Sequence, residues 1–212
     1  MATANKSGNL YLKLVPIMLS FFAMSFVDLV GTGTNFIKKD FGLSDTMAGL
    51  FPLMVFLWFL IFSVPTGLLM NRIGRRKTVL ISLVVTALAL LLPVLTIPMP
   101  HNTASFTIML VSFCLLGIGN AIMQVSLNPL LSNIVHGDRL ASALTLGQFV
   151  KAIGSFVAPI IAGWAALEFG NWKLLYPIFT GISILAVLSL GVTKIEEEDE
   201  KGEASTFRQC LA

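Results

Sequence analysis

The chain has 212 residues, 56% of them hydrophobic and 12% charged, and its formal net charge is +3. Soluble domains average about 45–50% apolar and about 25% charged residues, so a soluble core could not absorb this much apolar surface. The composition excludes a soluble globular domain and indicates an integral membrane protein, and the modest charge gives no reason to expect nucleic acid as a partner.

Six long apolar stretches follow one another along the chain. Each has about 19–27 residues, enough to cross roughly 30 Å of hydrocarbon as a helix. Because a backbone in lipid must satisfy its own hydrogen bonds, each stretch is expected to be α-helical. The predicted spans are 14–36, 47–70, 78–97, 106–127, 141–167 and 174–192. This pattern predicts an all-α membrane bundle over 14–192, after a cytoplasmic segment of residues 1–13.

Lysine and arginine residues are concentrated on one side of this predicted bundle. That side has Lys6, Lys13, Arg72, Arg75, Arg76, Lys77, Arg139, Lys194, Lys201 and Arg208, whereas the other has Lys38, Lys39 and Lys173. Cytoplasmic loops of membrane proteins carry an excess of basic residues. The pattern predicts a multi-pass protein of the cell's inner (cytoplasmic) membrane, with both termini in the cytoplasm.

The two halves of the chain match at an offset of 96 positions. Gly67, Gly74 and Lys77 recur as Gly163, Gly170 and Lys173, and the same offset places Asp28 over Gln124. Two three-helix units joined in series cross the membrane in opposite directions. The match therefore predicts a 3+3 inverted repeat, about 14–97 and 106–192, a plan that places the solute site of many secondary transporters near mid-membrane.

Polar side chains share one helix face in three of the six spans, because residues three or four apart stack on the same side. These sets are Ser25, Asp28, Thr32 and Asn35 in the first span, Asn120, Gln124 and Asn128 in the fourth, and Gln148, Lys151 and Ser155 in the fifth. A charged side chain at the membrane centre costs about 2.5–3.5 kcal/mol on insertion scales, so Asp28 and Lys151 indicate a functional site. We expect these three spans to line a wet cavity, and the third and sixth spans to face lipid.

Several of these polar side chains have structural alternatives. Hydroxyl groups in membrane helices commonly bond back to their own backbone, which is the role expected of Ser25, Thr32 and Ser155. Asparagine side chains either contact a solute or tie helices together, for about 0.6 kcal/mol each. This choice stays open for Asn35, Asn120 and Asn128.

Lys151 lies about 15 Å along its helix from the start of the span, farther than its side chain reaches by snorkelling. It either pairs with Asp28 or attracts an anionic group of a substrate. Trp164 and Trp172 are expected to anchor span ends at the membrane interface. The two histidines stand alone in loops, so no metal site, cofactor or enzymatic centre is expected.

The loop between the second and third spans resembles the signature loop of the major facilitator superfamily. The signature reads Gly-x-x-x-Asp-Arg-x-Gly-Arg-Arg/Lys, and its positions here are Gly67, Asn71, Arg72, Gly74, Arg75 and Arg76. The spacing matches throughout, with Asn71 in place of the usual Asp. The resemblance implies the amino-terminal half of a twelve-helix fold, in which this loop is thought to lock the outward-facing state.

Within the superfamily, the fourth span is similar to the fucose permease family of fucose–galactose–glucose:proton symporters. The similar run begins at Gly117 and ends at the pair Asn128-Pro129, and Gln148 and Gly154 follow it. The resemblance covers nearly all of this chain and half of a typical transporter. It implies a sugar symporter.

Three positions bear on the family's proton coupling and sugar binding. Asp28 matches the family's acidic residue in the first helix. Gln124 stands where the family has a Glu and cannot carry a proton, and Lys151 stands where the family places a neutral, sugar-bonding Asn. The departure at Gln124 concerns the family's proton coupling, and the departure at Lys151 concerns the family's neutral-sugar substrate.

The predicted function is proton-coupled transport of a sugar or sugar-like solute by alternating access, with a small-molecule solute, protons and the lipid bilayer as partners. Asp28 is expected to couple the proton, and the solute-binding candidates are Asn35, Asn120, Gln124, Asn128, Gln148 and Lys151. One alternative is an organic anion or sugar acid read by Lys151. A second is a non-transporting membrane scaffold or sensor that has kept the fold.

The end of the chain bears on whether this is a whole transporter. The segment 193–212 contains an acidic run, 196–203, followed by returning apolar residues. Such a segment is typical of the cytoplasmic linker between two six-helix halves. We expect the chain to be truncated before a second, carboxy-terminal six-helix half.

Overall fold

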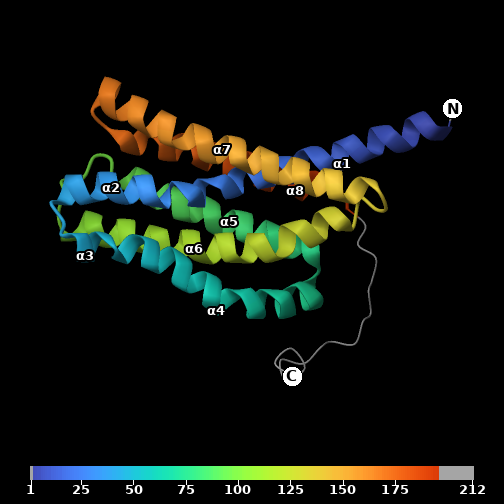
Figure 1. Cartoon of the computed structure of the whole chain (residues 1–212), viewed down its shortest axis with the longest axis horizontal. Helices are drawn as coiled ribbons and strands as arrows, with labels where there is room; N and C mark the ends of the chain where they lie inside the picture. The colour runs from blue at the N-terminus through green and yellow to red at the C-terminus, as the bar shows by residue number, and fades with distance from the viewer. Residues whose placement is uncertain (1, 196–212) are drawn as a thin grey trace.

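The computed structural model describes residues 2–195, with side chains described at residue 10 and from residue 12 onward. Within this range all regular structure is helical (Figure 1). The elements are α1 (Ala2–Met24), η1 (Ser25–Leu29), α2 (Val30–Phe41), α3 (Asp45–Ala48), α4 (Leu50–Ile73), α5 (Arg75–Leu95), α6 (Thr103–Ser132), α7 (Arg139–Phe169), η2 (Trp172–Leu174) and α8 (Leu175–Val192). Six helical stretches in this part of the chain are long and apolar enough to cross a membrane, which confirms the predicted number of spans.

The first span is one long helical stretch with a tight turn in its middle. It extends beyond both ends of the predicted span 14–36, because α1 begins earlier and α2 continues to Phe41. Between these helices lies the 3₁₀ turn η1, which carries Asp28. The Ser25 hydroxyl donates to the Phe22 carbonyl oxygen at 2.6 Å, where it competes with backbone hydrogen bonding. This interruption differs from the continuous helix that the sequence predicts.

Gly74 and Gly170, which the repeat makes equivalent, both end helices. The φ angle is 91° at Gly74, after α4, and 64° at Gly170, after α7. Positive φ strains residues with a Cβ, so the same backbone requirement explains glycine at both positions. Gly67 and Gly163 form the other glycine pair of the repeat. Both stand in open positions, since a Cβ at either would meet nothing within 4 Å.

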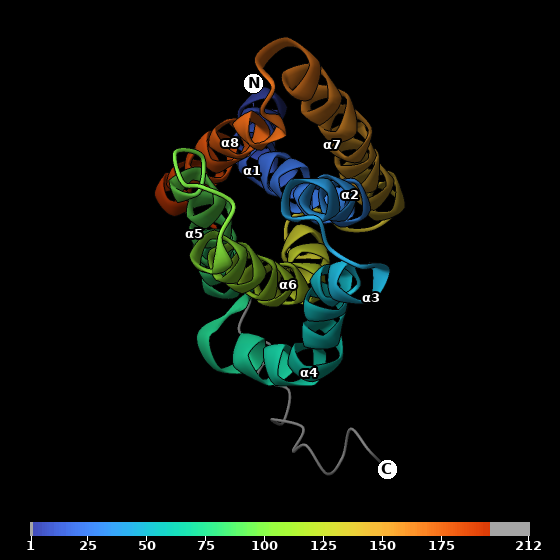
Figure 2. The same ribbon diagram turned by 90° about the vertical axis from the view of Figure 1, so that its left-hand side faces the viewer.

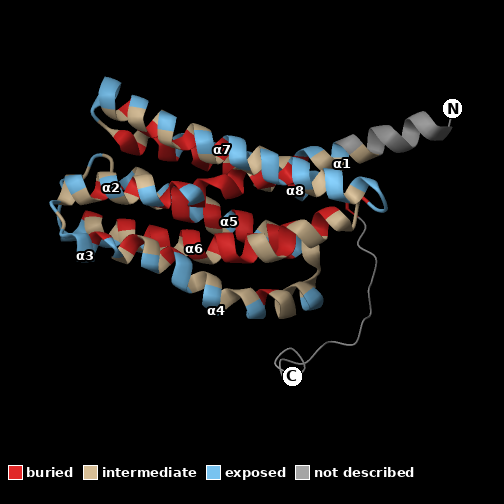
Figure 3. Ribbon diagram, viewed as in Figure 1, coloured by how far each residue is buried: buried red, intermediate tan, exposed pale blue. Residues whose placement is uncertain are grey.

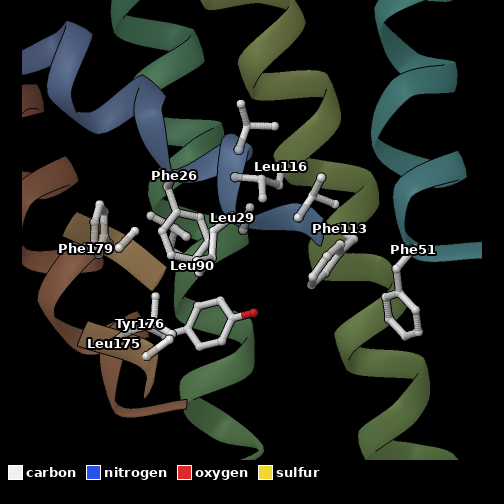
Figure 4. Close-up of a cluster of buried hydrophobic side chains, with 14 of the residues drawn as sticks. Phe26, Leu29, Phe51, Leu90, Phe113, Leu116, Leu175, Tyr176 and Phe179 are labelled. Carbon is white, nitrogen blue, oxygen red and sulfur yellow. The ribbon is translucent and has the colours of Figure 1, made fainter. Parts of the chain in front are cut away.

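The core is packed around α6, which is buried along much of its length (Figure 3). Figure 4 shows the cluster in which η1, α5, α6 and α8 meet. Phe26 of η1 packs against Phe179 and Tyr176 of α8, with ring centroids 4.9 and 5.3 Å apart. The buried aromatic contacts hold the turn that carries Asp28 against the bundle.

Two glycines bring α6 against helices on two sides. A Cβ at Gly117 would lie 2.5 Å from the carbonyl oxygen of Val55 in α4, and a Cβ at Gly119 would lie 2.6 Å from the Thr86 hydroxyl of α5. These separations are too short for any larger side chain without movement. The two glycines thus fix how closely α4 and α5 approach α6.

Viewed along the helices, α5 and α8 pack together at one edge of the bundle, while α4 and α7 lie at other edges (Figure 2). Apolar side chains of α5 and α8 are exposed along their edge, as Val84 and Leu188 illustrate. That these two spans face lipid stays a prediction, because large apolar side chains of α4 and α7 are exposed as well. The α1–η1–α2 stretch lies between α8 and α7, and so Asp28 is positioned away from the α5–α8 edge.

Candidate functional site

Asp28 of η1 and Lys151 of α7 form an ion pair within membrane-spanning helices. Lys151 Nζ lies 3.5 Å from Asp28 Oδ2, which confirms pairing as one of the two roles predicted for Lys151. The Ser155 hydroxyl lies 2.5 Å from the same carboxylate oxygen and 3.0 Å from the backbone carbonyl oxygen of Lys151. Its single proton can serve only one of these acceptors at a time. The Ser155 hydroxyl therefore donates either to its own backbone, the role predicted from the sequence, or to the Asp28 carboxylate.

The ion pair is partly open to the surface of the six-helix bundle. The side chain of Asp28 is 40% exposed and that of Lys151 is 16% exposed. Neither side chain of the pair is therefore fully enclosed by the bundle. Ionisable residues inside membrane spans are rare and commonly mark solute or proton pathways.

Small residues of α7 allow this helix to approach the first span closely. A Cβ at Gly154 would lie 2.1 Å from the Ser25 hydroxyl oxygen, and a Cβ at Gly147 would lie 2.6 Å from the Phe21 ring. Gly154 immediately precedes Ser155, so the close approach brings the Ser155 hydroxyl within reach of Asp28. The glycines of α7 thus bring Lys151 and Ser155, the two partners of the Asp28 carboxylate, close to the first span.

The polar residues of α6 differ in burial. Gln124 and Asn128 are half-buried, whereas Asn120 is only 3% exposed. Among the described residues, neither amide atom of Asn120 has a hydrogen-bond partner. A side chain this deeply buried is not open to a solute, so the structure does not support the predicted solute contact of Asn120. We leave it out of the solute site.

The other two solute-binding candidates lie on either side of the ion pair along the first and fifth spans. Gln148 is exposed one turn before Lys151 on α7. Asn35 lies about 10 Å along the helix from Asp28, beside Lys38 and Lys39 in a shallow pocket of about 430 Å³. Asn35 is therefore separate from the carboxylate, near the end of α2.

A second polar contact joins the end of the first span to the start of the sixth, and the sequence did not reveal it. The Trp172 indole N–H donates to Asp40 Oδ2 at 2.8 Å, and His101 Nε2 lies 3.8 Å from the same oxygen. Trp172 is 3% exposed, and its ring stacks on Phe36 with centroids 5.2 Å apart. The prediction that Trp172 anchors the membrane interface is therefore wrong, because its ring fills the core and its N–H has a protein acceptor.

The signature segment predicted as a loop between α4 and α5 is helical except at Gly74, and its arginines bond to the ends of two other helices. Arg75 donates to Asn133 Oδ1 at 2.9 Å, beyond the end of α6. Arg76 donates to the carbonyl oxygens of Leu190 and Gly191, at 3.0 and 2.7 Å, at the end of α8. Asn71 is exposed. The signature segment thus holds the basic ends of α5, α6 and α8 together.

No group of three or more His, Cys, Asp or Glu side chains in the described part of the chain is placed to hold a metal ion. The predicted acidic linker begins at residue 193, and its residues 196–212 lie outside the described residues, as do Lys201 and Arg208. The site that can be built from the described residues is therefore the Asp28–Lys151–Ser155 cluster and its neighbours on α6 and α7.

Comparison with known proteins gives one family and several relatives. The family model described as Major Facilitator Superfamily matches residues 17–209. A glucose/galactose transporter of Brucella abortus is 29% identical over 126 residues, which cover 58% of this chain and 29% of the relative. The lysosomal dipeptide transporter MFSD1 of Bos taurus is 25% identical over 187 residues, covering 87% of this chain and 38% of the relative. The aligned part thus spans well under half the length of these relatives.

Two solved structures have a similar fold. The E. coli fucose:proton symporter FucP in its outward conformation gives a TM-score of 0.71 at 18% identity, over 96% of this chain and 55% of that chain. A proton-dependent oligopeptide transporter gives a TM-score of 0.70 at 16% identity, over 97% of this chain and 46% of that chain. Each is similar to this chain in about half of its own length.

Proposed function

The chain belongs to the Major Facilitator Superfamily, and from this premise we propose that it forms the amino-terminal six-helix half of a secondary transporter for a sugar or sugar-like solute. The proposed mechanism is alternating access, in which two six-helix bundles rock about a solute site near mid-membrane. The observation that carries the proposal is the partly exposed Asp28–Lys151 ion pair inside two spans.

The similar proteins support a transporter and favour a sugar-type solute. One relative is named a glucose/galactose transporter, and one structure with the same fold is named a fucose:proton symporter. Another relative is named a dipeptide transporter, so the names do not agree on one solute. The choice of a sugar rests on the amide side chains of the fourth and fifth spans, since Gln124, Asn128 and Gln148 have donors and acceptors that suit hydroxyl groups.

In the proposed coupling step, a proton binds the Asp28 carboxylate. Protonation removes the negative charge that holds the Lys151 ammonium 3.5 Å away, so the contact between η1 and α7 weakens. Lys151 then becomes available to a polar group of the solute. Proton binding and helix movement are thereby linked through one ion pair.

The signature segment is the proposed lock of one conformational state. Its arginines already tie the ends of α5, α6 and α8 together. Asn71 cannot form the ion pair that an Asp at this position could form. We expect the segment to act here through the hydrogen bonds of Arg75 and Arg76.

The proposal extends to topology and to the rest of the transporter. We propose that both termini are cytoplasmic, that the membrane is the inner membrane, and that a second six-helix half completes the solute pathway. The concentration of basic residues on one side supports this orientation. The share of the similar structures that this chain covers, 55% and 46%, supports a second half.

An anionic solute is the second candidate. A sugar acid or other organic anion could displace Asp28 from the Lys151 ammonium, and the 16% exposure of Lys151 supports this route. A non-transporting scaffold or sensor is the third. It would keep the fold and the ion pair without moving solute.

Uptake into vesicles that contain the full-length transporter, with both six-helix halves, separates these candidates. Neutral hexoses, deoxyhexoses and sugar acids are supplied with and without an inward proton gradient. Accumulation of a neutral sugar only with the gradient supports the sugar symporter. Preference for the sugar acid supports the anion alternative, and no solute-specific uptake in either condition contradicts transport.

A further inference from the structure

An open apolar groove runs along the edge where α5 and α8 pack together. Its volume is about 540 Å³, and every residue that lines it is aliphatic or glycine. The lining includes Leu80, Ile81 and Val84 of α5, and Val187, Leu188 and Gly191 of α8. A sugar would find no hydrogen-bonding partner there, so this groove is distinct from the proposed solute site.

A second pocket, of about 480 Å³, continues this groove toward the basic end of the bundle. The two share Leu80 and Ile81, and the second is also lined by Arg72 and Lys77. Both cationic residues are exposed, and no carboxylate among the described residues forms an ion pair with either. The combined slot is aliphatic along its length and cationic at its mouth.

Arg76 fixes the two walls of the slot relative to each other. Its guanidinium donates to carbonyl oxygens at the end of α8, at Leu190 and Gly191. These bonds join the first turn of α5 to the last turn of α8, where the groove meets the basic pocket. The slot is thus held open by the fold, with Arg72 and Lys77 at its mouth.

The length of the slot is close to half the thickness of a bilayer's hydrocarbon core. From Lys77 to Val85, α5 rises about 12 Å. One leaflet of hydrocarbon is about 15 Å thick, half of the roughly 30 Å core. A chain that starts at the level of the two cations can therefore follow the groove through most of one leaflet.

We propose that this slot binds an anionic phospholipid, with one acyl chain in the α5–α8 groove and the phosphate between Arg72 and Lys77. Any phospholipid has a chain for the groove, but basic residues near the membrane surface select for negatively charged head groups. Apolar side chains are exposed along the edge that α5 and α8 form, and the sequence predicts that these two spans face lipid. The site does not depend on which solute is transported.

The head-group half of the proposal is tested by native mass spectrometry of the purified protein with phosphatidylglycerol or phosphatidylcholine. We expect retained phosphatidylglycerol in the native protein and about 25-fold weaker retention in R72Q/K77Q, because each of the two cations contributes about fivefold. The control is K13Q/R139Q, which loses the same charge elsewhere. Equal retention of both lipids, or equal losses in both variants, would overturn the proposal.

The groove half is tested by filling it. A Cβ at Gly191 or at Gly181 of α8 meets nothing within 4 Å, so either position accepts a larger side chain. Gly191 lines the groove and Gly181 does not. We expect Gly191→Leu to lose phosphatidylglycerol and Gly181→Leu to retain it. Unchanged retention in Gly191→Leu contradicts the groove.

The acidic run that follows α8 in the sequence could instead neutralise the two cations. The variant with Glu196, Glu197 and Glu198 changed to Gln tests this possibility. We expect it to retain phosphatidylglycerol as the native protein does. If the lipid binds only in this variant, the acidic run covers the cations and the lipid proposal is wrong.

Discussion

Gly154 of α7 lies so close to Ser25 of η1 that a Cβ at position 154 would stand 2.1 Å from the Ser25 hydroxyl oxygen and 2.8 Å from its Cβ. Rotation of the Ser25 side chain can move its hydroxyl oxygen away from a Cβ at position 154, but it cannot move the Ser25 Cβ. The close approach lies beside Ser155 and Asp28, whose side chains are 2.5 Å apart. The spacing between α7 and the first span therefore sets the geometry of the ion pair.

Gly154→Ala is expected to push α7 away from η1 and to lower the thermal stability of the purified protein. Overpacking of this kind costs about 1–3 kcal/mol. Gly163→Ala is the matched control on the same helix, because a Cβ there meets nothing within 4 Å. The measurement is the midpoint of thermal unfolding in one detergent. Equal midpoints for the two variants would show that η1 and α7 are not in close contact.

Gly117→Ala tests the contact between α6 and α4. Its Cβ would lie 2.5 Å from the carbonyl oxygen of Val55 and 2.8 Å from its Cα, and a backbone cannot rotate away as a side chain can. We expect a larger loss of thermal stability than for Gly154→Ala. Gly67→Ala, in the open part of α4, serves as the control. A Gly117→Ala protein as stable as this control would contradict the close helix packing.

The six spans follow from sequence because they depend on strongly constrained physics, and the contact between Asp28 and Lys151 is one of the two roles predicted for Lys151. Long apolar runs have no alternative to helices in lipid, and two opposite charges inside a membrane favour each other. The glycine ends of α4 and α7 also follow from the repeat. These features need no knowledge of how helices pack.

The features that the sequence did not reveal depend on neighbours far along the chain. The 3₁₀ turn at Asp28 is packed against Gly154, which lies in another span. Asn120, Gln124 and Asn128 share a face by spacing, yet positions four apart drift by about 40° around a helix. That drift, together with the packing of α6 against its neighbours, buries Asn120 and leaves the other two half-exposed.

Trp172→Phe is expected to destabilise the outer end of the bundle. The phenyl ring can still stack on Phe36, but Asp40 loses the indole N–H at 2.8 Å. A hydrogen bond to a charged group contributes about 1.5–3 kcal/mol. Trp164→Phe is the control, because Trp164 is 55% exposed. A double variant with Asp40→Asn should show non-additive unfolding midpoints, and strictly additive midpoints would contradict the bond.

Asn120→Leu is expected to leave the protein as stable as before or more stable. Burying polar atoms without partners costs about 1–3 kcal/mol, and leucine of similar size removes that cost. The contrasting variant is Ser112→Ala, which removes a 2.7 Å bond from Ser112 to the carbonyl oxygen of Ala89 and should cost about 0.6 kcal/mol. The measurement is the midpoint of thermal unfolding of each variant, compared with that of the native protein. A clear loss of stability in Asn120→Leu would show that its amide has partners in the membrane.

Asp28→Asn is expected to abolish proton-driven accumulation of the solute while allowing exchange of solute across the vesicle membrane without a gradient. An amide cannot take up and release a proton near neutral pH, but it still accepts hydrogen bonds from Ser155. Asp138→Asn, which removes an exposed carboxylate from a loop, is the control for loss of charge. Accumulation that survives in Asp28→Asn would remove the coupling role.

The same variant also tests the ion pair through stability, when it is combined with Lys151→Gln. Removing one partner of a fully buried pair costs about 3–5 kcal/mol, and the cost here is smaller because 40% of the Asp28 side chain is exposed. Each single variant leaves one charge without its partner, whereas the double variant leaves none. We expect the double variant to unfold at a higher temperature than either single variant, yet still to fail at proton-driven accumulation.

Restored stability without restored accumulation separates the structural role of the pair from its role in coupling. A double variant no more stable than the worse single variant would mean that Asp28 and Lys151 do not pair in the membrane.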